Sequence, residues 1–220
     1  MLTREQVFSQ AGGVEAFQKS MGLVVDGDAG PKTNNAALRV MLGLAKLAIP
    51  SASPGKDGKL RPGLDSAYGQ LVYVDYPKEK IKVKRDAGRI LVDSAWEKAN
   101  LVQKTLWDGQ KIRIHKDASE EFDFIFKAAV EASGYHPTYT VGYSPRHTLW
   151  NPGRSLSTHS WGCAADFNPD DNDLGGVDAR GQPSKMRKSP EFAKTFKFWG
   201  WTWGGDWSMR DDMHFQRAFV

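Results

Sequence analysis

The chain has little that would cross-link it covalently or anchor it in a membrane. It contains one cysteine, Cys163, so no disulfide can form within it, which suits folding in a reducing compartment. It has no apolar run long enough to span a bilayer, and residues 1–6 lack the apolar core of a secretory signal. We therefore expect a protein without membrane insertion, made in the cytosol without a signal peptide; if its substrate lies outside, something else must export it.

Two further features are missing. Lysine and arginine form no dense run with interleaved aromatic residues, so no nucleic acid partner is expected. There is no internal repeat, so the two halves of the chain differ in kind.

The net charge of +4 favours an acidic or polyanionic setting such as a bacterial cell envelope. A length of 220 residues is enough for one large or two small domains.

Residues 1–46 have the pattern of a small helical module. Thr3 and Gln6 form a candidate capping box, the pair at 12–13 separates two short helices, and Gly30-Pro31 opens a third. The order of FQ, GL, DG, GPKT and AL between residues 17 and 38 resembles the peptidoglycan-binding domain of the three-helix type. That resemblance implies a module that targets the cell wall. The alternative is a structural helical cap without a ligand.

The proline, glycine and serine content of residues 47–65 predicts a linker, which makes residues 66–220 a second domain. Short runs of β-forming residues there alternate with helical patterns, so we expect an α+β fold. The predicted strands lie at 70–76, 111–115 and 138–143, and the predicted helices at 92–107, 118–133 and 190–199. His115 precedes a predicted helix, so a capping or packed histidine is the simplest interpretation.

The segment 157–166 and its counterpart near residue 214 carry the residue types of a metal site. His159 and Asp166 are seven residues apart, so they reach one ion only if the chain bends near Gly162. Asp211 and His214 are three apart, which brings them together at a turn. Two imidazoles and one carboxylate are a ligand set that leaves a zinc coordination position open for water, and the second carboxylate is a candidate general base.

Other residues near these segments leave alternatives open. Arg146 follows a predicted strand, where it would hold the oxygen that gains charge during peptide attack or bind a substrate carboxylate; the alternative is a surface arginine. His147 is a candidate fourth ligand. Cys163, between small residues, is expected in the sheet. The acidic run at 169–173 lacks the ordered spacing of a calcium loop and reads as a solvated turn.

The motifs SxHxxGxAxD at 157–166 and GWxWGGxW…DxMHF at 200–215 resemble the zinc D-alanyl-D-alanine carboxypeptidases. That family includes the L-alanyl-D-glutamate endopeptidases of phage endolysins. The resemblance implies zinc bound by the two histidines and the aspartate (His159, Asp166 and His214), with Asp211 as the base and Arg146 and Ser157 near the substrate. It also implies the fold of the Hedgehog signalling domain, a small antiparallel sheet flanked by helices. Trp161 and Tyr143 are expected as further substrate contacts.

The expected function is therefore a monomeric peptidoglycan-degrading zinc peptidase, a phage endolysin that cuts the L-Ala–D-Glu bond of stem peptides. Two alternatives remain. The first is a D-alanyl-D-alanine carboxypeptidase acting on peptidoglycan precursors. The second is a non-catalytic wall-binding protein that keeps a structural zinc.

Overall fold

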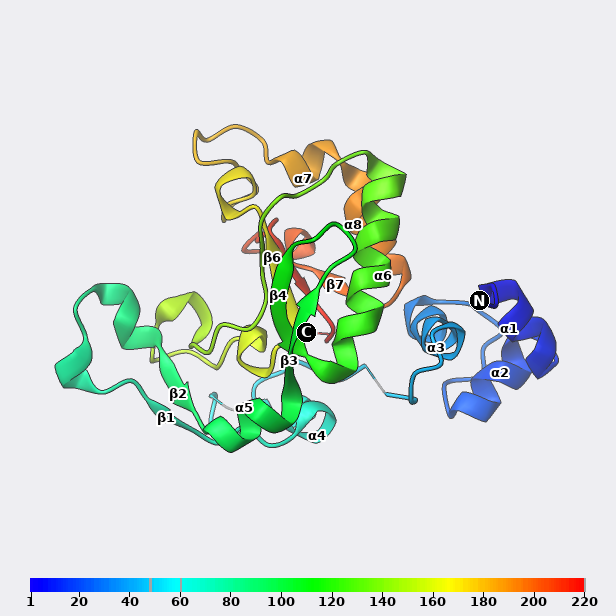
Figure 1. Cartoon of the computed structure of the whole chain (residues 1–220), viewed down its shortest axis with the longest axis horizontal. Coiled ribbons are helices and arrows are strands. Elements are labelled where there is room, and N and C mark those ends of the chain that lie inside the picture. Colours follow the sequence, from blue (N-terminus) through cyan, green and yellow to red (C-terminus); the bar gives the residue numbers. More distant parts are fainter. Residues whose placement is uncertain (48, 60, 220) are drawn as a thin grey trace.

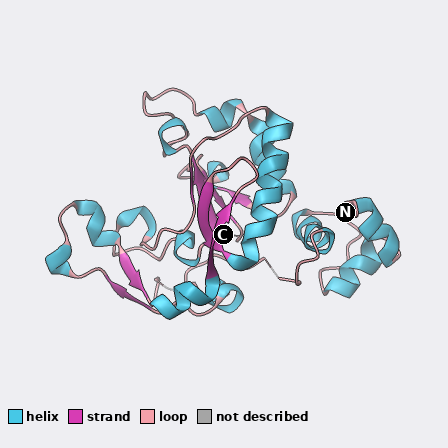
Figure 2. Ribbon diagram, viewed as in Figure 1, coloured by secondary structure: helices cyan, strands magenta, loops and turns pink. Residues whose placement is uncertain are grey.

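The computed structural model describes residues 1–47, 49–59 and 61–219. It mixes helices with small antiparallel sheets, in agreement with the predicted α+β class (Figure 2). Among the described residues, none of the helices combines the length and apolar character needed to cross a bilayer.

The first helices form a small module at one side of the molecule (Figure 1). They are α1 (Arg4–Ala11), α2 (Val14–Met21) and α3 (Pro31–Met41). Thr3 and Gln6 make the predicted capping box, and Gly12 ends α1 in the left-handed conformation at φ 89°. Phe8 and Phe17 pack edge to face with centroids 5.2 Å apart. The module therefore has an apolar core of its own.

Helix α3 also packs against the rest of the chain. Its Leu38 is fully buried in the main core. Its Arg39 donates to Glu121 at 2.7 Å, and Glu121 is also ion-paired with Arg217. All three charged side chains are at least 95% buried. Buried charges are tolerated only when paired, so this network fixes α3 in one position.

Removal of Glu121 should therefore destabilise the protein strongly. A Glu121→Ala variant leaves two buried guanidinium groups without their shared carboxylate, which costs about 3 to 5 kcal/mol. Urea unfolding followed by circular dichroism measures the loss. The neighbouring Glu120→Ala variant is the matched control, because Glu120 forms an exposed pair with Lys104 worth at most about 1 kcal/mol. Equal losses in the two variants would contradict the structural role of the network.

The segment expected as a linker is packed against later parts of the chain. It contains helix α4 (Pro62–Tyr68), in which Leu64 is fully buried. Ser51 pairs with Phe219 in a parallel bridge near the C-terminus. This part of the chain is thus held in place instead of behaving as a free tether.

A projecting arm follows, drawn in teal at the left of Figure 1. Its base is a two-stranded antiparallel sheet, and its tip carries two 3₁₀ turns. The elements are β1 (Tyr73–Asp75), η1 (Lys78–Lys80), η2 (Lys84–Gly88) and β2 (Ile90–Val92). Six lysines and arginines lie between residues 78 and 89, against two acidic residues, so the arm is basic.

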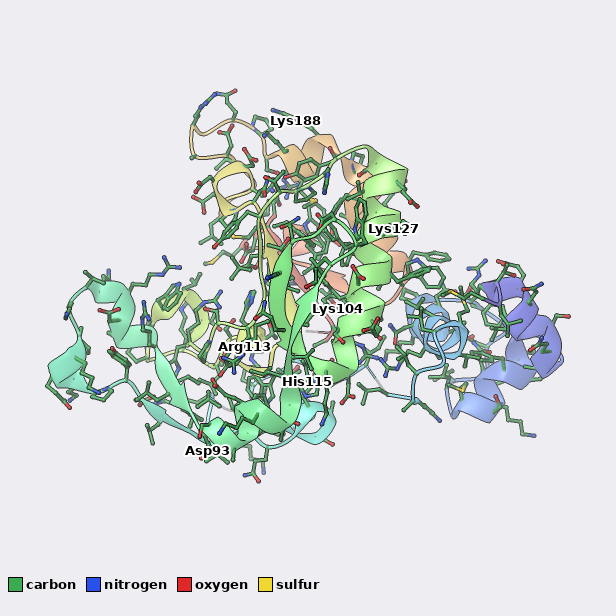
Figure 3. The ribbon with its side chains drawn as sticks, viewed as in Figure 1. Asp93, Lys104, Arg113, His115, Lys127 and Lys188 are labelled. Atoms are coloured by element: carbon green, nitrogen blue, oxygen red, sulfur yellow. The ribbon has the colours of Figure 1, made fainter. Side chains whose placement is uncertain are left out.

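The next elements lead into the longest helix. They are α5 (Ser94–Asn100), β3 (Leu101–Thr105), β4 (Lys111–His115) and α6 (Lys116–Ser133). The predicted helix over 92–107 is wrong beyond Asn100, because β3 pairs with β4 there. His115 accepts a hydrogen bond from Asp117 N–H, so it caps α6 as expected. Figure 3 labels it where β4 meets that helix.

A four-stranded antiparallel sheet with the order β5-β6-β8-β7 follows in the second half of the chain. Its strands are β5 (Thr140–Val141), β6 (Ala164–Phe167), β7 (Thr202–Trp203) and β8 (His214–Gln216). Helices α6, α7 (Lys185–Lys188) and α8 (Pro190–Phe198) lie beside it (Figure 1). Phe167 and Phe215 on the sheet pack against Phe122 and Phe196 on the helices. This aromatic core joins β6 and β8 to the helices.

Candidate metal centre

The register of the central sheet places two of the predicted ligands side by side. Asp166 on β6 lies directly opposite His214 on β8, and side chains opposite each other in an antiparallel pair are neighbours on one face. Asp166 Oδ1 is 2.9 Å from His214 Nδ1. Two residues 48 positions apart in the sequence therefore meet through strand pairing alone.

The third predicted ligand comes from a 3₁₀ turn, η4 (Thr158–Trp161), that precedes β6. Gly162 ends the turn with φ 69°, which supplies the bend that the sequence predicted. The bend brings His159 Nε2 to 3.0 Å from Asp166 Oδ1 and 3.1 Å from His214 Nδ1. The three residues form a buried cluster whose ligand atoms lie within 4.8 Å of one another.

Hydrogen bonds on the far sides of the two rings define which nitrogens are free. His159 Nδ1 donates to the carbonyl of Gly142 at 2.6 Å, so its Nε2 carries a lone pair. His214 Nε2 faces Gln216 Oε1 at 3.1 Å, and the Gln216 amide nitrogen donates to Ala218 O, which fixes that orientation. In neutral His214 this orientation leaves the lone pair on Nδ1. Two imidazole lone pairs and a carboxylate oxygen then converge, an arrangement that a cation satisfies.

The charge states of His159 and Asp166 fit this description. Burial lowers the pKa of His159, which favours the neutral ring. Burial alone would raise the pKa of Asp166, but the neighbouring His159 and His214 hold it well below its usual range. A neutral imidazole and an ionised carboxylate are the protonation states in which these groups bind metal. Burial alone would lower the pKa of His214, but its hydrogen bond to Asp166 raises that pKa, so a metal ion would displace a proton from this ring.

Asp211 lies beside the cluster in a different state. Burial raises its pKa to about 6, against the opposing effect of His214. Its Oδ1 is buried and accepts no hydrogen bond from any residue that the structure describes. The backbone of Gly204 packs closely against the turn that carries Asp211. A Cβ at this position would lie 2.5 Å from Asp211 O and 3.2 Å from His214 Cβ. Asp211 is thus a desolvated carboxylate with a free oxygen.

A cavity of about 340 Å³ opens over the cluster. Its walls include Asp166, Asp211, His214 and Arg146. Arg146 lies 3.6 Å from Asp166 Oδ2 and its side chain is only 13% exposed. The Arg146 side chain, predicted to bind substrate, therefore lines the same cavity as Asp166 and His214.

The other predicted substrate contacts divide into two groups. Ser157 lines the cavity, as expected. Trp161 does not, which corrects that expectation: its ring is fully buried and its indole N–H donates to Asp65 at 3.0 Å. Tyr143 lies outside the cavity wall as well, and its hydroxyl donates to Glu97 at 2.6 Å.

The remaining candidates lie away from the metal centre. His147 bonds to Arg154 O and to Asp75 Oδ1 at the base of the arm, so it is no fourth ligand. Cys163 is buried, and burial raises the pKa of its thiol to about 12.

Sequence reasoning missed three residues at the site. Gln216 orients His214, and the period-two pattern of a strand, which puts residues 214 and 216 on one face, was a usable signal. The Trp207 ring lies tilted against His214, with ring centroids 5.3 Å apart, and it is the last tryptophan of the motif at 200–207, which was a usable signal. Trp150 contacts Arg146, and no spacing in the sequence marks it.

Comparison with protein families matches residues 150–217 to a family described as D-alanyl-D-alanine carboxypeptidase. The match covers under a third of the chain, yet it contains His159, Asp166, Asp211 and His214. Searches of curated proteins and of solved structures gave no match. The family match and the His–Asp–His cluster together support a relationship of this segment to the D-alanyl-D-alanine carboxypeptidase family of peptidases.

Proposed function

We propose that the protein is a zinc-dependent peptidase that degrades bacterial peptidoglycan. The observation that carries the proposal is the convergence of two imidazole lone pairs and one carboxylate beside a buried, unpartnered acid. A structural zinc site fills all four positions with protein ligands, whereas a catalytic site leaves one open. Among the described residues three ligands converge here, which favours the catalytic type.

The spacing of the three ligand atoms fits zinc. A tetrahedral ion with bonds of about 2.1 Å separates its ligand atoms by about 3.4 Å. The observed separations are 2.9, 3.0 and 3.1 Å, so side-chain shifts of a few tenths of an ångström seat the ion. When bound, zinc would polarise a carbonyl group and lower the pKa of water, so that hydroxide is available for attack at neutral pH.

The chain itself supplies the proton transfers and the positioning. Asp211 Oδ1 accepts the proton of the attacking water and later delivers it to the leaving amine, a role that suits a carboxyl group with a raised pKa. The Arg146 guanidinium donates a hydrogen bond to the carbonyl oxygen of the scissile peptide bond as that atom gains charge, or to a substrate carboxylate. Ser157 lines the same cavity as Asp211 and Arg146.

Within this class we propose an endolysin of phage type that cuts the L-Ala–D-Glu bond, acting as a monomer after release from the host cytoplasm. The likeness of its motifs to such enzymes supports this choice, as does the pattern of residues 1–46, which we propose as a peptidoglycan-binding module. The D-alanyl-D-alanine carboxypeptidase activity is the second candidate, because the matched family carries that description.

Mass spectrometry of purified peptidoglycan digested by the zinc-loaded protein tests the proposal. We expect fragments with new N-terminal D-glutamate and C-terminal L-alanine, and no release when a chelator is present. Release of single D-alanine residues would identify the carboxypeptidase instead. A protein that binds zinc and releases no fragment would contradict a peptidase function.

A further inference from the structure

A second hollow of about 620 Å³ shares part of its wall with the cavity over the metal centre. Arg85, Leu149 and Trp150 line both spaces. The second hollow also borders on Lys84 and Arg154, and no acidic residue is on its wall. A ligand that extends from the metal centre past Trp150 therefore enters a cationic environment.

Three arginines lie near the Trp150 indole. Arg89 Cζ is 5.8 Å from the ring centroid, and Arg89 is ion-paired with Asp86 at 3.0 Å. The other two are closer. Arg85 Cζ is 4.1 Å from the ring centroid, and Arg146 Cζ is 5.1 Å away, both within the range of cation–π contact. The two cations differ in their partners. Arg146 has Asp166 at 3.6 Å, whereas Arg85 forms no ion pair with any acid among residues 1–47, 49–59 and 61–219.

Close backbone packing holds Arg85 in this place. Gly88, at the end of η2, approaches Trp150 so closely that a Cβ there would lie 2.1 Å from the Trp150 carbonyl carbon. Its carbonyl accepts from His147 N–H at 2.8 Å. The base of the arm is thus clamped to the loop that carries Trp150, and Arg85, three residues before Gly88, is placed over the ring.

The loop itself adopts an unusual conformation. Leu149 and Trp150 both have positive φ, at 54° and 57°, which is uncommon for residues other than glycine. Such conformations are found most often at ligand-binding and active sites. His147 stabilises the loop, since its two ring nitrogens bond to Arg154 O and Asp75 Oδ1.

The electrostatics of the wall call for an anion. The guanidinium groups of Arg85 and Arg146 both line the cavity and both contact the Trp150 ring. Of these two, Arg146 alone has a compensating carboxylate among the described residues. A ligand carboxylate would supply the missing charge and accept hydrogen bonds in the fork geometry that arginine favours.

We propose that Arg85, seated on Trp150, binds a second carboxylate of an acidic peptide substrate, one that lies away from the bond that is cut. The hollow beside it takes that part of the peptide. This proposal rests on the peptidase function proposed above, and it makes the basic arm a determinant of specificity.

Binding measurements on the full-length, zinc-loaded protein test this role. Isothermal titration calorimetry in the Asp211→Asn background prevents turnover during the measurement. The ligands are a stem peptide with all carboxylates free and a panel in which one carboxylate at a time is an amide. We expect one amide to bind about tenfold more weakly than the free acid, and we expect Arg85→Gln to bind that amide and the acid equally.

Lys80→Gln is the control, because it removes the same charge from an exposed site on the arm that lines neither cavity. It should preserve the difference between acid and amide. If Arg85→Gln weakens both peptides by one factor, or changes neither, the carboxylate contact is overturned. Cleavage of the acid peptide by the wild-type protein reports separately on the peptidase function. Cleavage without the Arg85 effect refutes this inference alone, and failure to bind or cleave any peptide refutes both.

Discussion

An Asp211→Asn variant should retain its metal and lose at least about 100-fold in kcat, the range that general acid–base catalysis contributes. The amide has the shape of the carboxyl group but accepts no proton from the attacking water. A neutral group also costs less to bury than the carboxylate whose pKa is raised to about 6, so the metal-free variant should unfold at the same or a higher temperature. Steady-state kinetics on peptidoglycan fragments, with metal content by mass spectrometry, measure both effects.

Asp206→Asn is the control for this variant, because Asp206 is exposed on the preceding turn and pairs with Lys197. Its turnover should equal that of the wild type. The pH profile adds a second check. Asp211 accepts a proton only above its pKa, and a bound cation lowers that pKa, so wild-type turnover should decline below a pH at or under about 6. An Asp211→Asn protein that still lyses cell walls at the wild-type rate would remove Asp211 from the mechanism.

A His214→Ala variant should lose both the metal and the activity. It removes one of three converging ligand atoms, and the effect should exceed the 10- to 100-fold loss of metal affinity that follows removal of an outer partner. Gln216→Ala should show the smaller loss of zinc affinity, because Gln216 orients the His214 ring without being a ligand itself. Zinc titration against a competing chelator should rank wild type first, Gln216→Ala second and His214→Ala last.

The control is His136→Ala, since His136 lies on the surface and bonds to Asp108. Zinc should raise the melting temperature of the wild type and of this control, because a ligand that binds the folded state stabilises it. Zinc should leave the melting temperature of His214→Ala unchanged. Equal zinc affinity in His214→Ala and the wild type would show that the metal binds elsewhere.

The sequence was most informative where side-chain chemistry and local geometry agree. The convergence of His159 with Asp166 was predictable because Gly162 allows the bend that their odd spacing requires. The helix over 118–133 was predictable from its apolar face, and its capping by His115 from the position before it. The pairing of Asp166 with His214 was expected from chemistry alone, because no local pattern reveals a strand register between distant segments.

Residues whose roles depend on tertiary contacts were less predictable. Trp161 is two residues after a ligand in the sequence, but η4 turns its ring into the core, where Asp65 accepts its N–H. Helical propensity favoured residues 92–107, but pairing with β4 makes the second half a strand. Arg85 reaches the cavity only because Gly88 lets the arm approach Trp150. Contacts of this kind follow from the whole fold.

Anomalous diffraction at the zinc edge, from crystals of the zinc-loaded protein, tests the central claim most directly. The account predicts one strong peak about 2.0 to 2.2 Å from His159 Nε2, Asp166 Oδ1 and His214 Nδ1, with the fourth position open to the cavity that contains Asp211. A peak coordinated by other residues, or a fourth protein ligand closing the site, would contradict it.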